Sequence, residues 1–473
     1  MKIRFSVNQI SFGTLARLCG GELHQGALGE VAVRYICTDS READRETAFV
    51  AMRGERADGH DFIAVALSRG CRCVICEHRT EELERSDATA IVVGNSELAL
   101  SLLANNYRNY LHCKTVAVTG SVGKTTTKDL VASVLSVGTH AAKTQGNHNS
   151  LVGMPLSMVS IPTDSDWAVL EMGMSGFGEI ERLSICAEPD IAIITNVGSS
   201  HMEMLGSREN ICRAKLEILS GLKSGGVLIL PLDEPLLQNV CGKSYRTVYV
   251  SLFCEKADFL AQNIRVENDR TVFDIVYADG VAKELAIRIL GKHNVYAALY
   301  AFAVGKLAGL CDEQIREGLL RYSPDGMRQH IYEMGKITVI EDCYNASPES
   351  MIAAVDVLTE YCRRTGRRSV AVLGDMLELG ADSPALHRSV GVYLAEKKID
   401  RLFTVGKRAD QIAVGARQRG MSKQSITSNA QTDCLSRTAE GLSETLQAGD
   451  VVLFKASRSV GAEAIIGELR DRI

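Results

Sequence analysis

Apolar and polar positions alternate along this chain in a pattern that predicts strands and helices in turn. Short apolar runs predict buried strands, and segments with apolar residues every three or four positions predict the helices between them. In the middle of the chain the predicted strands are residues 115–118, 167–171, 190–195 and 227–230. Such an alternation is typical of a parallel, doubly wound sheet with helices on both faces.

A second alternation of the same kind begins near residue 325. Its predicted strands are residues 337–340, 369–373, 401–405 and 451–454, and its predicted helices lie near 349–363, 384–397, 407–419 and 431–447. Between the two units, residues 264–290 show a β-rich pattern, and residues 295–307 are expected to form a helix. The first 110 residues mix short strands and helices.

We therefore predict an α/β protein with three domains. Residues 1–110 would form a small mixed α/β domain, residues 111–323 a central domain with a parallel doubly wound sheet, and residues 324–473 a Rossmann-like α/β domain. The length of 473 residues fits three domains of ordinary size.

Composition narrows the class of protein. Lys and Arg number 53 against 58 Asp and Glu, a net charge of −5, which argues against a protein dedicated to nucleic acid or to a membrane surface. The chain has no apolar run long enough to span a bilayer, and its first residues lack the apolar core of a signal peptide. We expect a monomeric, cytoplasmic protein that acts on small molecules, without stable membrane insertion.

The chain contains 14 cysteines, scattered through apolar stretches. Cys71, Cys73 and Cys76 lie close together, but their spacing alternates along an apolar strand and no second Cys or His pair follows nearby. Reduced cysteines pack as small apolar residues, so strand packing is favoured over a metal site.

The most informative segment follows the strand predicted at residues 115–118. It consists of Thr119, Gly120, Ser121, Val122, Gly123, Lys124, Thr125 and Thr126, and a predicted helix comes directly after it. Free N–H groups and the dipole at a helix N-terminus favour an anion there. Lys124 can reach outer phosphates and the Thr125 hydroxyl can bind Mg²⁺, so we predict a nucleoside triphosphate site.

This segment is not the standard P-loop string. That string has a further glycine, separated from the Gly-Lys pair by four residues, where this chain has Val118. The alternative is an ordinary turn before a helix. The strand before the segment and the helix after it favour a phosphate-binding loop.

Polar residues also follow two other predicted strands of the central unit. Glu171 ends one strand and could complete a Mg²⁺ shell with Thr125. Asn196 and His201 follow the strand predicted at residues 190–195, on a loop that should face the ligand crevice. A lone histidine is often a hydrogen-bonded structural group, so a structural role and a ligand role for His201 both remain open.

Other polar residues have ordinary interpretations when each is taken alone. Lys215 is most simply a solvated helix lysine, and Asp342 a helix or turn cap. Asn147 and Asn149 are first interpreted as turn residues. Two cations follow the final strand and could either meet an anionic substrate group or lie on the surface, namely Lys455 and Arg458.

Together these strings resemble the Mur ligase family, ATP-dependent amide ligases of bacterial cell-wall synthesis, over nearly the whole chain. Residues 119–126 match the family's phosphate loop, and residues 146–149 match its Gly-Asn-x-Asn element. Residues 171–173, residues 195–198 and His201 match the metal and substrate loops. Ala214-Lys215 matches the lysine that the family often carbamylates.

The last domain carries strings specific to one member of that family. Residues 342–348 and 373–380 are similar to strings of the member that adds D-alanyl-D-alanine to UDP-N-acetylmuramoyl-tripeptide. Near the N-terminus, Asp39-Ser40-Arg41 and Gly59-His60 resemble the region that binds the uridine nucleotide. The chain departs from the family pattern at three positions beside retained residues, Ser150, Glu341 and Ala456.

The resemblance implies a ligase that uses ATP and Mg²⁺. ATP would convert the terminal carboxylate of the tripeptide to an acyl phosphate, and the amine of D-alanyl-D-alanine would attack it through a tetrahedral intermediate. The products would be UDP-N-acetylmuramoyl-pentapeptide, ADP and phosphate. The first domain would bind the UDP substrate, the central domain ATP, and the last domain the incoming dipeptide.

The resemblance also implies roles for individual residues. Catalytic roles would belong to Lys124, His201 and Lys215, and metal binding to Thr125, Glu171, His201 and carbamylated Lys215. ATP would contact residues 119–126 together with Asn294, Arg328 and Asp342. The UDP substrate would contact Ser40, Arg41, Asp58 and His60. Substrate positioning would involve Asn147, Asn149, Asn196, Tyr344, Asn345, Lys455 and Arg458.

Three other functions are less consistent with the sequence. A regulatory GTPase needs a guanine-reading Asn-Lys-x-Asp string, which this sequence lacks. A sister ligase that builds polyglutamate tails would lack the uridine-type first domain and the string at residues 342–348. A binding protein without catalysis would not need Lys124, Glu171 and Lys215 together.

Overall fold

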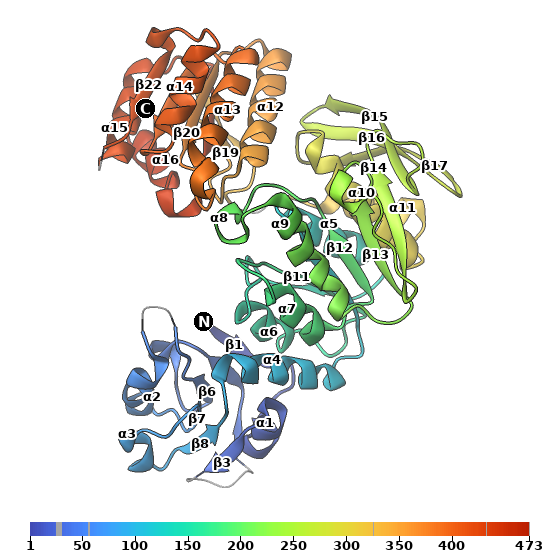
Figure 1. Ribbon diagram of the computed structural model, residues 1–473, viewed down its shortest axis with the longest axis vertical. Coiled ribbons are helices and arrows are strands. Elements are labelled where there is room, and N and C mark those ends of the chain that lie inside the picture. Colours follow the sequence, from blue (N-terminus) through green and yellow to red (C-terminus); the bar gives the residue numbers. More distant parts are fainter. Residues whose placement is uncertain (25–30, 55–56, 325, 432, 473) are drawn as a thin grey trace.

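The computed structural model describes residues 1–24, 31–54, 57–324, 326–431 and 433–472. Figure 1 shows three domains in a row, with the N-terminal domain at one end, the C-terminal domain at the other and the central domain between them. Each domain is built on its own sheet. The predicted α/β class with three domains is therefore confirmed.

The N-terminal domain has a six-stranded sheet in the order β1-β5-β6-β7-β8-β3. These strands are Lys2–Arg4, Tyr35–Cys37, Thr47–Val50, Cys73–Cys76, Thr89–Val92 and Glu22–His24, and a separate pair consists of β2 (Ile10–Ser11) and β4 (Ala32–Val33). Its helices are α1 (Phe12–Cys19), α2 (Ile63–Ser68), α3 (Glu81–Glu84) and α4 (Ser96–Tyr107). Cys73 and Cys76 are buried in β7, as strand packing requires.

The central sheet has nine strands in the order β10-β11-β9-β12-β13-β14-β15-β16-β17. They are Ala141–Lys143, Trp167–Glu171, Lys114–Thr119, Ile191–Ile194, Gly226–Pro231, Tyr245–Ser251, Phe259–Glu267, Arg270–Tyr277 and Gly280–Ile287. The pairs from β10 to β15 are parallel, and β15, β16 and β17 pair antiparallel. The β-rich segment near residues 264–290 thus extends the same sheet.

Both faces of the inner, parallel part of this sheet are covered, which is why strands β11, β12 and β13 are almost uniformly apolar. On β9, Val116 and Val118 belong to one core and Ala117 to the other. The first core includes α5 (Lys124–Leu135), α10 (His293–Leu307) and α11 (Asp312–Arg321). The opposite face carries α6 (Gly153–Met158), α7 (Glu179–Ala187) and α9 (Arg208–Leu216).

The second of these cores is shared with the N-terminal domain. It joins residues of α1 and α4 to residues of α6 and α7. Tyr107, at the end of α4, is fully buried, and its hydroxyl lies 2.8 Å from Ser6 Oγ. The N-terminal and central domains are therefore held together by a continuous apolar core.

The C-terminal domain has a six-stranded sheet in the order β18-β19-β23-β20-β21-β22. The strands are His330–Met334, Ile337–Glu341, Val451–Lys455, Ser369–Gly374, Arg401–Val405 and Ile426–Asn429, and all pairs except β18 with β19 are parallel. The helices are α12 (Pro348–Thr365), α13 (Ser383–Glu396), α14 (Asp410–Gln418), α15 (Cys434–Thr445) and α16 (Glu463–Arg470). The sequence pattern predicted four of these strands and missed β18 and β22.

Within the described part of the chain, no helix combines the length and the apolar character needed to cross a bilayer. The longest helix is α12, with 18 residues and a charged outer face.

Helices α13 and α14 pack so closely that glycine is required between them. A Cβ atom at Gly391 would lie 1.9 Å from the carbonyl oxygen of Ile412. We expect Gly391→Ala to lower the thermal unfolding midpoint, because the clash forces a shift that costs about 1–3 kcal/mol. Calorimetry or circular dichroism would measure the midpoint.

The matched control is Gly467→Ala in α16, where a Cβ atom would have no neighbour within 4 Å. Alanine is a better helix residue than glycine by about 0.5–1 kcal/mol, so this variant should unfold at an equal or higher temperature. An unchanged midpoint for Gly391→Ala would contradict the close approach.

Candidate active site

A cavity of about 590 Å³ lies between the central and C-terminal domains. The central domain contributes strand ends and the loops after them, and the C-terminal domain contributes the segment after β19. Among the residues predicted for the site, those that line the cavity are Ser121, Val122, Gly123, Lys124, Thr125, Thr126, Asn147, Asn149, Glu171, Asn196, His201, Asn294, Arg328, Asp342, Tyr344, Asn345 and Lys455. The structure thus brings together residues more than 300 positions apart.

The phosphate loop joins β9 to α5 and depends on two glycines. Gly120 has φ 150° and Gly123 has φ 83°, both in the region that side chains disfavour. A Cβ atom at Gly120 would lie 1.8 Å from Thr195 Oγ1 on the neighbouring strand end. Thr119 and Gly120, at the start of the loop, are not among the residues that line the cavity.

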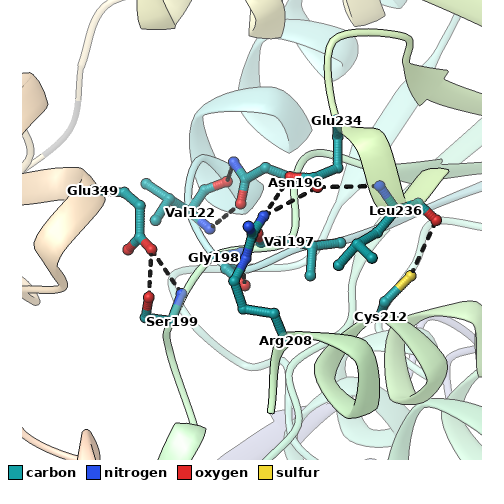
Figure 2. Close-up of polar contacts among 11 residues, drawn as sticks. Val122, Asn196, Val197, Gly198, Ser199, Arg208, Cys212, Glu234, Leu236 and Glu349 are labelled. Carbon is teal, nitrogen blue, oxygen red and sulfur yellow. Dashed lines mark hydrogen bonds and ion pairs between the residues drawn. The ribbon is translucent and has the colours of Figure 1, made fainter. Parts of the chain in front are cut away.

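Asn196 fixes the shape of this loop (Figure 2). Its Oδ1 accepts a hydrogen bond from the Val122 amide at 3.0 Å, and its Nδ2 donates to the Val122 carbonyl at 2.9 Å. The Gly198 amide donates to Ser121 Oγ at 2.9 Å. Asn196 therefore acts on the loop itself, a contact that the resemblance alone did not reveal.

Lys124 is positioned to meet an anion. It is the first residue of α5, and its amine donates to the Gly120 carbonyl at 2.8 Å. Burial lowers the pKa of this amine; the Glu171 carboxylate opposes the shift and Arg328 adds to it. A phosphate would favour the charged amine, so the loop, its N–H groups and Lys124 suit a triphosphate.

Oxygen ligands suited to Mg²⁺ lie beside Lys124. Glu171 ends β11 and is 2% exposed, and its Oε2 accepts a hydrogen bond from Thr125 Oγ1 at 2.8 Å. Its Oε1 accepts a hydrogen bond from Asn149 Nδ2 at 2.7 Å. One carboxylate and one hydroxyl next to a phosphate site form the hard donor set that Mg²⁺ prefers, so Thr125 and Glu171 fit this ion.

Lys128 belongs to the same cluster and was missed by sequence reasoning. Its amine is buried, lies 3.7 Å from Glu171 Oε2 and donates to the Gly146 carbonyl at 3.0 Å. It lies one helical turn after Lys124, and this spacing of four residues could have identified it. Lys128 connects the metal carboxylate to the loop that carries Asn147 and Asn149.

His201 lies at the junction of two domains. It has φ 66°, and its Nδ1 lies 2.7 Å from Oε2 of Glu378 in the C-terminal domain. This contact lowers the pKa of the Glu378 carboxyl. With Nδ1 facing Glu378, Nε2 is the ring nitrogen left for a ligand on the cavity side.

Lys215 is not the solvated lysine that its local sequence favours. It lies in α9 and is 1% exposed. Burial, with a smaller effect from Lys124, lowers the pKa of its amine well below the usual value. In the described part of the chain its amine has no hydrogen bond or ion pair, and Lys215 is not among the cavity-lining residues. A role for Lys215 as a second metal ligand with His201 therefore stays a prediction.

The nucleotide end of the cavity is formed by both domains. Asn294, near the start of α10, donates from Nδ2 to the Leu290 carbonyl at 2.7 Å, which leaves its Oδ1 as an acceptor. Desolvation in the cavity lowers the pKa of the neighbouring His293 to about 4, which favours the neutral ring. From the C-terminal domain, the Arg328 guanidinium lies 3.7 Å from the centre of the Tyr344 ring.

Two cations expected near the dipeptide carboxylate have other partners. Lys455 is 3% exposed and donates to Asp342 Oδ2 at 2.6 Å and to the Asn345 carbonyl at 3.0 Å. Arg458 lies outside the cavity lining and donates to Glu463 at 2.8 Å. Lys455 therefore orients Asp342, because burial with a carboxylate partner leaves it little freedom to bind another anion.

The predicted uridine-binding residues lie apart from this cavity, in the N-terminal domain. Ser40 is buried, and the exposed Arg41 forms an ion pair with Asp39 at 2.7 Å. His60 is buried, with Nδ1 2.6 Å from Asp58 and Nε2 accepting from the Glu77 amide at 2.9 Å. Both ring nitrogens of His60 are engaged, so it shapes the loop rather than offering a free nitrogen.

Three family models match the chain. The Mur ligase middle domain matches residues 118–305, the Mur ligase glutamate ligase domain matches residues 327–458, and the Mur ligase family catalytic domain matches residues 32–108. With the phosphate loop and the cavity between two α/β domains, these matches define the class: the chain belongs to the Mur ligase family.

Two of the most similar relatives carry the same name. The chain is 39% identical to UDP-N-acetylmuramoyl-tripeptide--D-alanyl-D-alanine ligase of Bacillus subtilis, over 96% of this chain and 97% of the relative. It is 31% identical to the enzyme of that name from Escherichia coli, over 98% of each chain. The fold is similar to a crystal structure of MurF from Acinetobacter baumannii, with a TM-score of 0.88, 29% identity and coverage of 98% and 99%.

A structure of MurF ligase from Thermotoga maritima in complex with ADP is also similar, with a TM-score of 0.81 and 29% identity. It covers 92% of this chain and 97% of that chain.

The close approach of Gly120 to Thr195 predicts a loss of nucleotide binding on substitution. In Gly120→Ala, the added methyl group must displace either the phosphate loop or the end of β12. We expect the affinity for ADP, measured by calorimetry, to fall by at least about tenfold, which corresponds to about 1.4 kcal/mol. Gly467→Ala serves as the control and should bind ADP normally; equal affinities in both variants would contradict this account of the loop.

Proposed function

We propose that this chain joins D-alanyl-D-alanine to UDP-N-acetylmuramoyl-tripeptide at the expense of ATP. The observation that carries the proposal is the cavity in which Lys124, Thr125 and Glu171 face Arg328 and Asp342 of another domain. Relatives covering the full chain are named for this reaction. We place the enzyme in the cytoplasm, where ATP and the UDP-linked substrate are available.

The chemistry explains why a phosphate site is needed. A carboxylate does not react with an amine in water, because its oxygen is a poor leaving group. Phosphorylation of the tripeptide carboxylate by ATP gives an acyl phosphate, from which the dipeptide amine expels phosphate through a tetrahedral intermediate. Both steps gather negative charge, so cations and accurate positioning should supply most of the catalysis.

The residues of the cavity meet this requirement. Lys124 and the loop N–H groups hold the outer phosphates, and Thr125 and Glu171 hold Mg²⁺. Bound there, Mg²⁺ would neutralise phosphate charge. Asn294 accepts from the adenine amino group, and Asp342, held by Lys455, binds the ribose.

Lys215 has the chemical state that carbamylation requires. A neutral amine can add carbon dioxide, and burial favours the neutral form of the Lys215 amine by lowering its pKa. The carbamate would place an anionic oxygen group next to Lys124 where the unmodified side chain has an amine. The added negative charge would favour the charged form of Lys124.

The domain arrangement supports a division of the other substrates between the two flanking domains. The N-terminal domain, with Ser40 and Arg41, binds the UDP group, and the C-terminal domain, with Tyr344 and Asn345, receives the dipeptide. Closure of the C-terminal domain on the cavity excludes water and protects the acyl phosphate from hydrolysis.

Mass spectrometry of the product tests the proposal. Incubation with UDP-N-acetylmuramoyl-tripeptide, ATP and D-alanyl-D-alanine should give the UDP-linked pentapeptide with one phosphate released per bond. Phosphate release should depend on both substrates across a panel of dipeptides. Ligation without ATP consumption, or ATP turnover with an amino acid acceptor alone, would contradict the proposal.

Lys124→Ala should reduce pentapeptide formation by at least about a hundredfold, because one preorganised cation at the transferred phosphate is lost. Product formation followed by mass spectrometry measures the loss. Lys243→Ala, an exposed lysine of the same domain, is the control and should keep full activity. Near-normal turnover by Lys124→Ala would remove Lys124 from the phosphate site.

Lys215→Ala should also be inactive, but short carboxylates such as acetate should partly restore its activity. The carboxylate would occupy the space of the carbamate and supply the same anionic oxygens. Initial rates at increasing acetate concentration, with wild type as control, provide the measurement. An active Lys215→Ala variant that does not respond to acetate would show that Lys215 has no carbamate role.

A further inference from the structure

One short loop of the central domain, residues 196–203, is held from four directions, and we name it the coupling loop. Its first side chain, Asn196, fixes the phosphate loop at Val122. From behind, Arg208 donates to the Val197 carbonyl at 2.7 Å and also pairs with Glu234 (Figure 2). The coupling loop is thus part of the phosphate site rather than a free connection.

Two consecutive amides of the coupling loop face different domains. The Gly198 amide donates to Ser121 Oγ in the phosphate loop at 2.9 Å. The next amide, that of Ser199, donates to Oε1 of Glu349 in the C-terminal domain at 2.8 Å. Ser199 Oγ donates to the same oxygen at 2.7 Å, so one carboxylate oxygen accepts two hydrogen bonds across the domain boundary.

Glu349 is in the first turn of α12, where the helix dipole favours a negative charge. The approach to the coupling loop is close, since a Cβ atom at Gly198 would lie 3.0 Å from Cδ of Glu349. The second carboxylate oxygen, Oε2, is buried without a hydrogen-bond partner in the described structure. A buried carboxylate oxygen without a hydrogen-bond partner is costly for stability, which points to a role outside stability.

A second contact of the C-terminal domain reaches the other end of the coupling loop. Besides the contact of His201 with the Glu378 side chain, the Glu203 amide donates to the Glu378 carbonyl at 3.1 Å. A Cβ atom at Gly380 would lie 3.2 Å from Cα of Glu203. The C-terminal domain therefore docks on both ends of the loop that shapes the phosphate site.

We propose that Glu349 is a positioning residue for phosphoryl transfer, which couples docking of the C-terminal domain to the geometry of the phosphate loop through Ser199 and Gly198. When Glu349 accepts the hydrogen bonds of Ser199, the Gly198 amide is directed at Ser121 and the phosphate loop keeps its shape. In the same arrangement, Arg328 and Asp342 of the C-terminal domain line the cavity. This inference rests on the proposed ligase function and deepens it.

The test compares the steady-state kinetics of Glu349→Ala with those of wild type. Loss of the carboxylate leaves the amide and hydroxyl of buried Ser199 without an acceptor and frees the coupling loop. We expect kcat to fall by about 30-fold, equivalent to about 2 kcal/mol, while the affinity for ADP stays within about threefold. Glu349→Gln retains a carbonyl oxygen that can accept both hydrogen bonds, so kcat should stay within about threefold of wild type.

Two further variants separate a local effect from a general one. Glu360→Ala removes a partly exposed carboxylate of the same helix that forms an ion pair with Arg363, three residues further on, and kcat should not change. Ser199→Ala keeps the amide and loses one of the two hydrogen bonds, so its kcat should lie between wild type and Glu349→Ala. Hydrogen exchange should become faster at residues 120–123 and 198–199 in Glu349→Ala and not in Glu360→Ala.

Three results would overturn the inference. The first is a kcat for Glu349→Ala within about threefold of wild type. The second is an ADP affinity of this variant that falls by the same factor as its kcat. The third is an unchanged rate of hydrogen exchange at residues 120–123 of this variant. Wild-type enzyme assayed in parallel shows whether the proposed coupling or the proposed ligase function has failed. If wild type forms no pentapeptide, the function is wrong; if wild type is active and Glu349→Ala equally so, only the coupling is wrong.

Discussion

The close contact between the ends of β9 and β12 is the constraint on which the rest of the site depends. Gly120 lies against Thr195, and Asn196 binds both backbone groups of Val122, so the phosphate loop takes its shape from the neighbouring strand. Parallel strands place their carboxyl ends at one edge of a sheet, and this edge also brings Glu171 next to Thr125. Phosphate binding and metal binding therefore arise from one piece of sheet geometry.

The two flanking domains are attached to the central domain in different ways. The N-terminal domain shares a continuous apolar core with it, and such a core resists rearrangement. The C-terminal domain meets it through polar contacts, among them those of Glu349 with Ser199 and of Glu378 with His201, and through a smaller apolar contact at Leu290. Polar contacts of this kind can open and re-form, which suits a domain that must admit substrates and then exclude water.

Burial gives ordinary side chains unusual properties in this protein. Lys215 is fully buried and Lys124 is partly buried, and desolvation lowers the pKa of both amines. In Lys215 the result is an amine suited to carbamylation, and in Lys124 it is an amine that gains from an anionic ligand. The same physical effect thus prepares two lysines for different chemistry, because only Lys124 faces the cavity.

The sequence by itself determined the α/β class, the three-domain organisation, the family and the phosphate loop, because strand and helix periods and local strings such as residues 119–126 are properties of neighbouring residues. Strands β18 and β22 were missed, since β18 is an edge hairpin strand and β22 is only partly buried. Only the tertiary structure decided that Lys215 is buried and that Lys455 is paired with Asp342. It also decided that His60 has no free ring nitrogen and that Glu349 and Glu378 belong to the site. Burial and pairing depend on which distant segments the fold brings into contact, and no local pattern in the chain records those contacts.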